Sequence, residues 1–233
     1  MTGFFDPTYW IFMLPGLLMV MLAQLWVSST YRKWGRVRNA SGLSGVDAAR
    51  RLLTYSGLHD VSVEGTAGNL TDHYDPRRRV LRLSAGVAQS PSVASLAITA
   101  HEIGHAMQHR AGYFPLRLRS ALVPVANLGS WLGWILIFVG LILRSVDIAW
   151  LGVLAFAAGA VFALATLPVE LNASTRARAL VAETGLASGE EERRGVSAML
   201  NAAAFTYVAA LAAAILQLLY YVLLVGGMGR RRR

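Results

Sequence analysis

Four long apolar stretches dominate the pattern of hydrophobic and polar positions along the chain. They run from about Tyr9 to Val27, Leu122 to Leu143, Ile148 to Leu167 and Ala202 to Val225. A helix needs about 20 predominantly apolar residues to cross the hydrocarbon core of a bilayer, and each stretch meets that length. The pattern therefore predicts a mostly α-helical membrane protein with four transmembrane helices.

The polar stretch between the first two spans, residues 28–120, has a different pattern. Ser44 to Leu53 carries a capping residue and helical apolar spacing. Apolar and polar residues alternate, as is typical of β-strands, over Val61–Glu64 and Val80–Ser84. A further helix is expected over about residues 92–109. We therefore expect a small α+β insert whose two or three strands come just before that helix.

These patterns divide the chain into five segments. An N-terminal transmembrane helix (1–27) is followed by the α+β insert (28–120) and a transmembrane hairpin (121–168). A helical segment (169–201) then leads to a last transmembrane helix with a basic tail (202–233). The two polar segments are expected to meet on one side of the membrane, because a hairpin of two spans separates them.

Composition supports the membrane prediction. The chain has 233 residues, of which 55% are hydrophobic, against about 45–50% in a typical soluble domain. The net charge of +9 is interpreted as loop charge of a membrane protein rather than as a nucleic-acid surface, because no nucleic-acid-binding motif accompanies it. The chain contains no cysteine, which excludes disulfides and thiolate ligands for a metal.

The distribution of basic residues predicts the orientation in the membrane. Residues 28–120 carry 13 Lys and Arg, and residues 169–201 carry four more. The positive-inside rule places both segments in the cytoplasm and the N-terminus outside. Four spans then put the C-terminal run Arg230–Arg233 outside, against the same rule.

The sequence His101-Glu102-Ile103-Gly104-His105 carries the candidate chemistry. On a helix, residues four apart lie on nearly the same face, so the two imidazoles can bind one Zn²⁺ ion. Glu102 would act as the general base that takes a proton from a zinc-activated water. The alternative is a chance arrangement on a helix face. Ser92 and Gly112 at the two ends favour the helix that the motif needs.

A catalytic zinc usually has three protein ligands and a water. His109 lies about 12 Å along the helix axis from His101, so the two cannot share an ion. The longer metzincin motif is excluded by Gln108 and Ala111 at the positions where it needs glycine and histidine. His73 lies in turn-like surroundings and is interpreted as a surface or substrate-side residue.

Glu170 is the candidate for the third ligand. It follows the third span, and a carboxylate at a membrane boundary is costly unless it is paired or bound to a metal. The hairpin returns Glu170 to the side of His101. The alternative is an interfacial glutamate paired with Arg176 or Arg178.

Two further features are candidates for the chemistry. Tyr207, at the start of the fourth span, is a candidate stabiliser of the developing oxyanion, and the alternative is an interfacial aromatic anchor. The strand at Val80–Ser84 is a candidate for binding an extended peptide by edge pairing.

Three runs of sequence, Leu70–Pro76, His101–Gln108 and Leu167–Ser174, resemble the YugP-type family of bacterial membrane zinc metallopeptidases. The resemblance covers nearly the whole chain. It implies a multi-pass protein of the bacterial inner membrane that uses one zinc ion.

The chain is also distantly similar to HtpX and to the CAAX-prenyl proteases. Their second motif, E-x-x-A-D-x-x-A, is matched by Glu170, Ala173, Ser174 and Ala177. Ser174 stands where that motif has an aspartate, which would support a ligating histidine by a hydrogen bond. The resemblance therefore implies a role for Ser174 beside the metal ligands.

The motif and the resemblance together predict a membrane-embedded zinc metalloendopeptidase with a gluzincin-like catalytic insert facing the cytoplasm. Its expected partners are a peptide or membrane-protein substrate and the lipid bilayer, with no nucleic acid. The alternative is a non-catalytic, metal-stabilised membrane scaffold or chaperone-like protein. Glu102 argues against that alternative, because a structural zinc needs no base. The sequence carries no signal of the oligomeric state.

Overall fold

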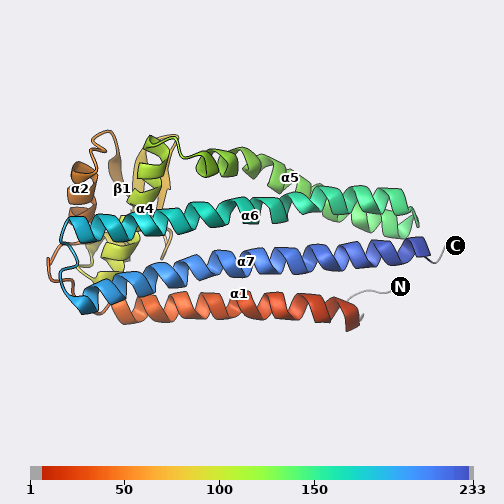
Figure 1. The fold of residues 1–233 in the computed structure, drawn as a ribbon, viewed down its shortest axis with the longest axis horizontal. Helices are drawn as coiled ribbons and strands as arrows, with labels where there is room; N and C mark the ends of the chain where they lie inside the picture. The colour runs from red at the N-terminus through yellow and green to blue at the C-terminus, as the bar shows by residue number, and fades with distance from the viewer. Residues whose placement is uncertain (1–6, 231–233) are drawn as a thin grey trace. The chain divides into compact units, whose positions relative to one another are not determined.

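Four long helices carry the apolar stretches of the chain (Figure 1). They are α1 (Pro7–Trp34), α5 (Phe114–Ile142), α6 (Val146–Glu183) and α7 (Glu190–Arg230). Each is long and apolar enough to cross a membrane, which confirms the prediction of four such helices. The computed structural model describes residues 7–230, so the start of the predicted N-terminal helix and the last three arginines of the basic tail lie outside the described residues.

Helices α6 and α7 are much longer than the apolar stretches, with 38 and 41 residues. The polar end of α6 stays helical because it has an amphipathic face of its own. Val169, Ala173, Ala177 and Leu180 are buried at the spacing of successive helical turns. Hydropathy alone marks only the lipid-length portion of such a helix.

The chain forms two compact units. The first, here called the helical unit, contains residues 7–23, 117–168 and 206–230 of the described chain. The second, here called the α+β unit, contains Gln24–Leu116 and Val169–Phe205.

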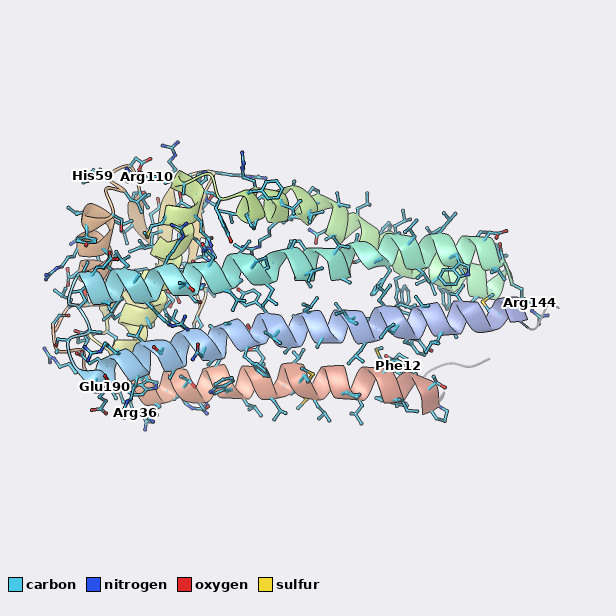
Figure 2. The ribbon with its side chains drawn as sticks, viewed as in Figure 1. Phe12, Arg36, His59, Arg110, Arg144 and Glu190 are labelled. Atoms are coloured by element: carbon cyan, nitrogen blue, oxygen red, sulfur yellow. The ribbon has the colours of Figure 1, made fainter. Side chains whose placement is uncertain are left out.

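The helical unit has close helix packing inside and apolar side chains outside. A Cβ atom on Gly133 would lie 2.5 Å from the backbone nitrogen of Phe156, so α5 and α6 are in backbone contact. Phe12, labelled in Figure 2, packs against Tyr220 with ring centroids 6.4 Å apart. Many large apolar side chains on these helices are exposed, such as Leu154 at 72% and Trp131 at 66%. Such a surface is typical of a protein covered by lipid.

The α+β unit contains a three-stranded sheet and three shorter helices. The strands are β1 (Ser62–Thr66), β2 (His73–Asp75) and β3 (Val80–Ser84), and the helices are α2 (Gly45–Tyr55), α3 (Ala85–Gln89) and α4 (Val93–Arg110). The strand order is β1-β3-β2, with β1 parallel and β2 antiparallel to β3.

This order corrects one prediction about the sheet. The strand at Val80–Ser84 is the candidate for binding an extended peptide by edge pairing, but it is the central strand and is paired on both sides. The two outer strands of the sheet are β1 and β2. The three-residue strand β2 is short and polar, so its pairing with β3 could not be read from alternation of hydrophobic residues.

The predicted helices at 44–53 and 92–109 are confirmed within two residues at each end. Both begin at a serine cap: Ser44 accepts a hydrogen bond from the backbone N–H of Asp47, and Ser92 accepts one from that of Ser95. These bonds satisfy N–H groups that the first helical turn leaves without a partner.

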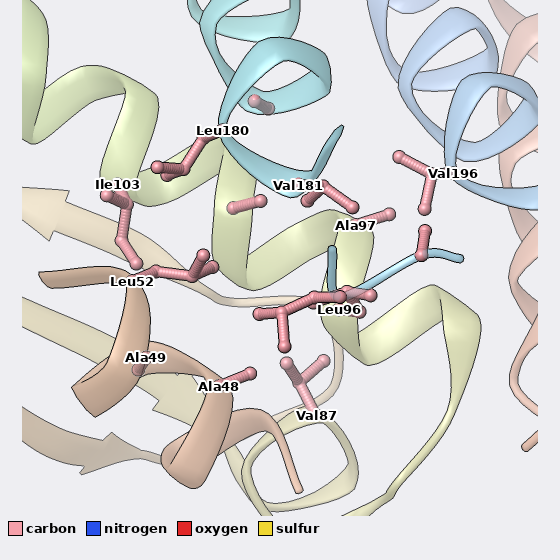
Figure 3. Packing of buried hydrophobic residues seen from close by; sticks show 14 of the residues in the cluster. Ala48, Ala49, Leu52, Val87, Leu96, Ala97, Ile103, Leu180, Val181 and Val196 are labelled. Carbon is pink, nitrogen blue, oxygen red and sulfur yellow. The ribbon is translucent and has the colours of Figure 1, made fainter. Parts of the chain in front are cut away.

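The hydrophobic core of the α+β unit is shared by segments far apart in the sequence (Figure 3). Leu52 of α2, Leu96 and Ile103 of α4, Leu180 of α6 and Val196 of α7 are all buried in it. The polar ends of α6 and α7 therefore belong to the same packed body as α4, and that body fixes Glu170 relative to the histidines.

Helices α4 and α6 cross in close contact at Gly104. A Cβ atom at this position would lie 2.6 Å from the carbonyl oxygen of Ala173 and 3.3 Å from its Cα atom. Only a residue without a side chain lets the two backbones approach this closely. The crossing places the face of α4 that carries His101 and His105 next to the turn of α6 that carries Glu170.

We expect Gly104→Ala to lower the free energy of unfolding by about 1–3 kcal/mol, because the added methyl group must push backbone atoms apart. Denaturant unfolding of the detergent-solubilised protein measures this change. Gly65→Ala is the matched control, because a Cβ atom there meets nothing within 4 Å, and we expect a change within about 0.5 kcal/mol. Equal stabilities of the two variants would contradict the close crossing.

Candidate metal centre

Helix α4 presents its two histidines side by side, and α6 brings a carboxylate to both. The imidazole rings of His101 and His105 have centroids 4.8 Å apart. Oε2 of Glu170 lies 3.3 Å from Nε2 of His101 and 3.4 Å from Nε2 of His105. The Glu170 side chain is only 2% exposed, so this carboxylate is buried against the two imidazoles.

The three side chains fit a zinc ion. Ligand atoms at about 2.1 Å from a tetrahedral ion lie about 3.4 Å from one another, which agrees with the two nitrogen–oxygen distances. Two imidazole nitrogens and one carboxylate oxygen are also a common ligand set of catalytic zinc. The structure therefore brings together His101, His105 and Glu170, as the sequence predicted, in an arrangement that can hold a metal ion.

The alternative partners considered for Glu170 are engaged with asparagines. The guanidinium group of Arg176 donates to Oδ1 of Asn172, and that of Arg178 donates to Oδ1 of Asn201. These contacts support a role for the Glu170 carboxylate at the histidines.

Each histidine has a partner at its other ring nitrogen. Nδ1 of His101 lies 3.3 Å from the hydroxyl of Ser174, and Nδ1 of His105 lies 3.0 Å from Oε1 of Gln108. Such partners orient metal-binding imidazoles and leave Nε2 directed at the metal. Ser174 thus stands where the resemblance placed it, whereas Gln108 was not among the predicted site residues. Its position three residues after His105, on the same side of the helix, was the available signal.

Glu102 is buried beside the two histidines and is held by a backbone group. Its Oε2 accepts a hydrogen bond of 3.0 Å from the N–H of Tyr74, in strand β2. Burial raises the pKa of Glu102, and the nearby imidazoles oppose that rise only in part. A carboxyl group with a raised pKa is suited to accept and release a proton near neutral pH.

Asp72 fixes the start of β2 and with it the backbone N–H that contacts Glu102. Its carboxylate accepts hydrogen bonds from the backbone N–H of Ser84 at 2.7 Å and from the Ser84 hydroxyl at 3.0 Å. The position of Tyr74 beside Glu102 therefore depends on this link between β2 and β3. Neither Asp72 nor Tyr74 was predicted, because their roles come from the pairing of a strand that the sequence pattern does not reveal.

The other predicted residues are not members of the ligand cluster found among the described residues. His73 is exposed, its Nδ1 lies 2.8 Å from the carbonyl oxygen of Thr71, and its Nε2 lies 3.3 Å from Nη1 of Arg82. His109 contacts the hydroxyl of Tyr74 at 2.9 Å, which agrees with its exclusion as a ligand. Tyr207 lies in the helical unit, where it is half-buried, and its catalytic role stays a prediction.

The fold and the site define a helical membrane protein with a candidate His-His-Glu metal centre. The model of a family described as "Putative neutral zinc metallopeptidase" matches residues 9–226. The chain belongs to this family, which confirms the resemblance seen in the sequence.

A relative from Bacillus subtilis (strain 168) is named "Putative membrane protease YugP". It is 43% identical to this chain over 202 residues, which cover 87% of the chain and 89% of the relative. No solved structure matches the chain.

We expect zinc affinity to fall as the pH is lowered, starting above the ordinary histidine pKa of about 6.5. Burial disfavours the charged imidazole of His105, but the hydrogen bond that this charged form donates from Nε2 to Glu170 and the nearby carboxylates outweigh this effect and raise its pKa. Since zinc binds only the unprotonated imidazole, protons compete for the site at a higher pH than at an ordinary histidine.

Zinc titrations against a chelating dye, at pH values from about 8 down to about 6, measure this dependence. A constant affinity over that range would contradict the raised pKa of His105.

Proposed function

We propose that this protein is a membrane-embedded zinc metalloendopeptidase that hydrolyses peptide bonds. The observation that carries the proposal is the convergence of Nε2 of His101 and His105 on one carboxylate oxygen of Glu170, with the buried carboxyl group of Glu102 beside them. Zinc held by these three residues would polarise the scissile carbonyl group and acidify a water molecule.

Glu102 acts as the general base and then as the general acid. Its carboxylate takes a proton from the attacking water and delivers it to the nitrogen of the leaving amine. The N–H of Tyr74 holds one oxygen of Glu102, which orients the carboxylate for both transfers. The raised pKa of Glu102 matches this double role, because the group must be deprotonated before the attack and protonated after it.

The outer edge of β2 is the proposed binding place for the substrate backbone. The N–H of Tyr74 is hydrogen-bonded to Glu102, so an extended peptide laid along this edge would pass the carboxylate. Main-chain hydrogen bonding of this kind accepts many sequences. It therefore suits an endopeptidase that acts on peptides or membrane proteins.

The α+β unit is the proposed gluzincin-like catalytic domain, in which α4 supplies two ligands and the polar end of α6 supplies the third. Ser174 is proposed to support His101. Tyr207 stays a candidate for stabilising the oxyanion, and His73 a candidate for substrate contact.

The proposed location is the bacterial inner membrane, with the site facing the cytoplasm. Eleven Lys and Arg residues lie in Gln24–Leu116 and four in Val169–Phe205. These segments form one compact unit, so their charges must lie on the same side of the membrane as the metal ligands. The positive-inside rule then favours the cytoplasmic side.

We expect Glu102→Gln to keep zinc and to lose hydrolysis by about 10²–10⁴-fold, because the amide preserves the shape but cannot accept the proton. Metal analysis together with cleavage of denatured casein measures both properties. Glu191→Gln is the control, because Glu191 is an exposed residue of the first turn of α7, and its activity should equal that of the wild type.

Two outcomes would contradict the proposal. If the Glu102→Gln protein cleaves as fast as the wild type, Glu102 is not the general base. A wild-type protein that binds zinc but cleaves no peptide would favour the metal-stabilised scaffold instead.

We expect Glu170→Gln to weaken zinc binding by more than about 100-fold, which exceeds the usual loss for a residue that only supports a ligand. A neutral amide is a poor ligand for zinc, so only the two imidazoles would remain. Competition with a chelating dye measures the affinity, and His73→Ala, which lies outside the ligand cluster, should bind as the wild type does. If the Glu170→Gln protein is fully loaded with zinc, Glu170 is not the third ligand.

A further inference from the structure

Gln108 is a fully buried polar side chain in the contact between α4 and α6. Its exposure is 0%, and both ends of its amide are hydrogen-bonded. Nε2 donates to the carbonyl oxygen of Val169 at 2.7 Å and to Oδ1 of Asn172 at 3.0 Å. Oε1 lies 3.0 Å from Nδ1 of His105. Burying an amide is costly unless its bonds are satisfied, and here three bonds satisfy it.

These partners fix the orientation of the amide. The backbone carbonyl of Val169 can only accept, so the amide atom that faces it must be the nitrogen. Asn172 gives the same result independently, because its Oδ1 already accepts from the Arg176 guanidinium, which can only donate. The oxygen of Gln108 must therefore face His105.

The orientation of the amide fixes the tautomer of His105. An amide oxygen only accepts, so Nδ1 of His105 carries the hydrogen and Nε2 keeps its lone pair. Nε2 is the atom directed at Glu170. His101 is held differently. The hydroxyl of Ser174 beside its Nδ1 can both donate and accept, so it does not set the tautomer of His101.

The same amide also fixes the third ligand. Val169 immediately precedes Glu170, so the 2.7 Å bond from Gln108 ties the backbone beside Glu170 to the helix that carries the histidines. One side chain thus sets both the tautomer of His105 and the position of α6 next to it.

We propose that Gln108 is a positioning residue of the metal centre, which holds His105 with Nε2 open to the metal and holds Glu170 within reach of it. This inference rests on the proposed zinc site and does not depend on peptide hydrolysis. It is therefore tested by metal binding in the absence of any substrate.

The experiment compares two variants of similar size in the full-length protein in detergent. Gln108→Leu removes every hydrogen bond, whereas Gln108→Glu keeps an oxygen acceptor for His105 and loses the donor to Val169. Zinc affinity is measured by dye competition, and cobalt(II) absorption spectra report the ligand geometry. We expect Gln108→Leu to bind zinc about 10–100-fold more weakly than the wild type, with an altered cobalt spectrum. Gln108→Glu should bind more tightly than Gln108→Leu.

Thr99→Val is the matched control. Thr99 is also fully buried on α4, and its hydroxyl has no hydrogen-bond partner among the residues that the structure describes. The substitution therefore makes a buried polar residue of the same helix apolar without touching the ligands. Its zinc affinity and cobalt spectrum should match those of the wild type.

Two results with these variants would overturn the inference. If folded Gln108→Leu protein binds zinc with wild-type affinity, the amide has no role in positioning the ligands. If the leucine and glutamate variants lose zinc affinity equally, Gln108 contributes only to helix packing. A wild-type protein that does not bind zinc would instead refute the proposed function itself.

A measurement on the wild-type chain covers the case in which the variants do not fold. In the metal-free protein labelled with ¹⁵N-histidine, at a pH where the imidazole is neutral, nitrogen chemical shifts distinguish the two tautomers. The resonances of His105 are assigned by their loss in His105→Ala. We expect the Nδ1–H tautomer, and the Nε2–H tautomer would overturn the inference.

Discussion

The close crossing of α4 and α6 at Gly104 and Ala173 is the contact on which the candidate metal centre depends. It joins two segments of the chain that a hairpin of two apolar helices separates in sequence. The bonds from Ser174 to His101 and from Gln108 to Val169, and the contacts of Glu170 with both imidazoles, all span this crossing. A side chain at position 104 would lengthen each of them. The glycine inside the zinc motif therefore has a steric role that is separate from the chemistry of its neighbours.

Three adjacent faces of α4 make different contacts at the site, because successive residues are rotated by about 100° around a helix. The face with Gly104 and Gln108 packs on α6, the middle face presents the histidines, and the face with Glu102 meets strand β2. The candidate ligands are thus held from one side, and Glu102, the proposed proton-transfer group, is held from the other. A change in the sheet would move Glu102 while leaving the ligand set in place, and a change in α6 would do the reverse.

The sequence was sufficient for the features that depend on local pattern. The four apolar helices, the serine caps of α2 and α4, and strand β3 follow from spacing and composition, and the two histidines follow from their separation of four residues. The role of Asp72 was not accessible, and that of Gln108 was indicated only by its place three residues after His105, because burial of a polar side chain depends on which segments pack together. The short polar strand β2 was missed because it lacks alternating hydrophobic residues. Without β2 in the predicted sheet, β3 was expected to have an edge open to a peptide. Glu170 was accessible only because a carboxylate beside an apolar span demands an explanation.

The bonds around the ligands also affect how strongly the site can hold a metal. Metal affinity is reduced by whatever free energy is needed to assemble the ligands. Here the carboxylate of Glu170 is already beside both imidazoles, and their other nitrogens are already hydrogen-bonded. Little reorganisation remains for the ion to drive, since the packing of the α+β core has fixed the ligand positions. A candidate site assembled in this way would hold a metal ion with little loss of binding free energy to reorganisation.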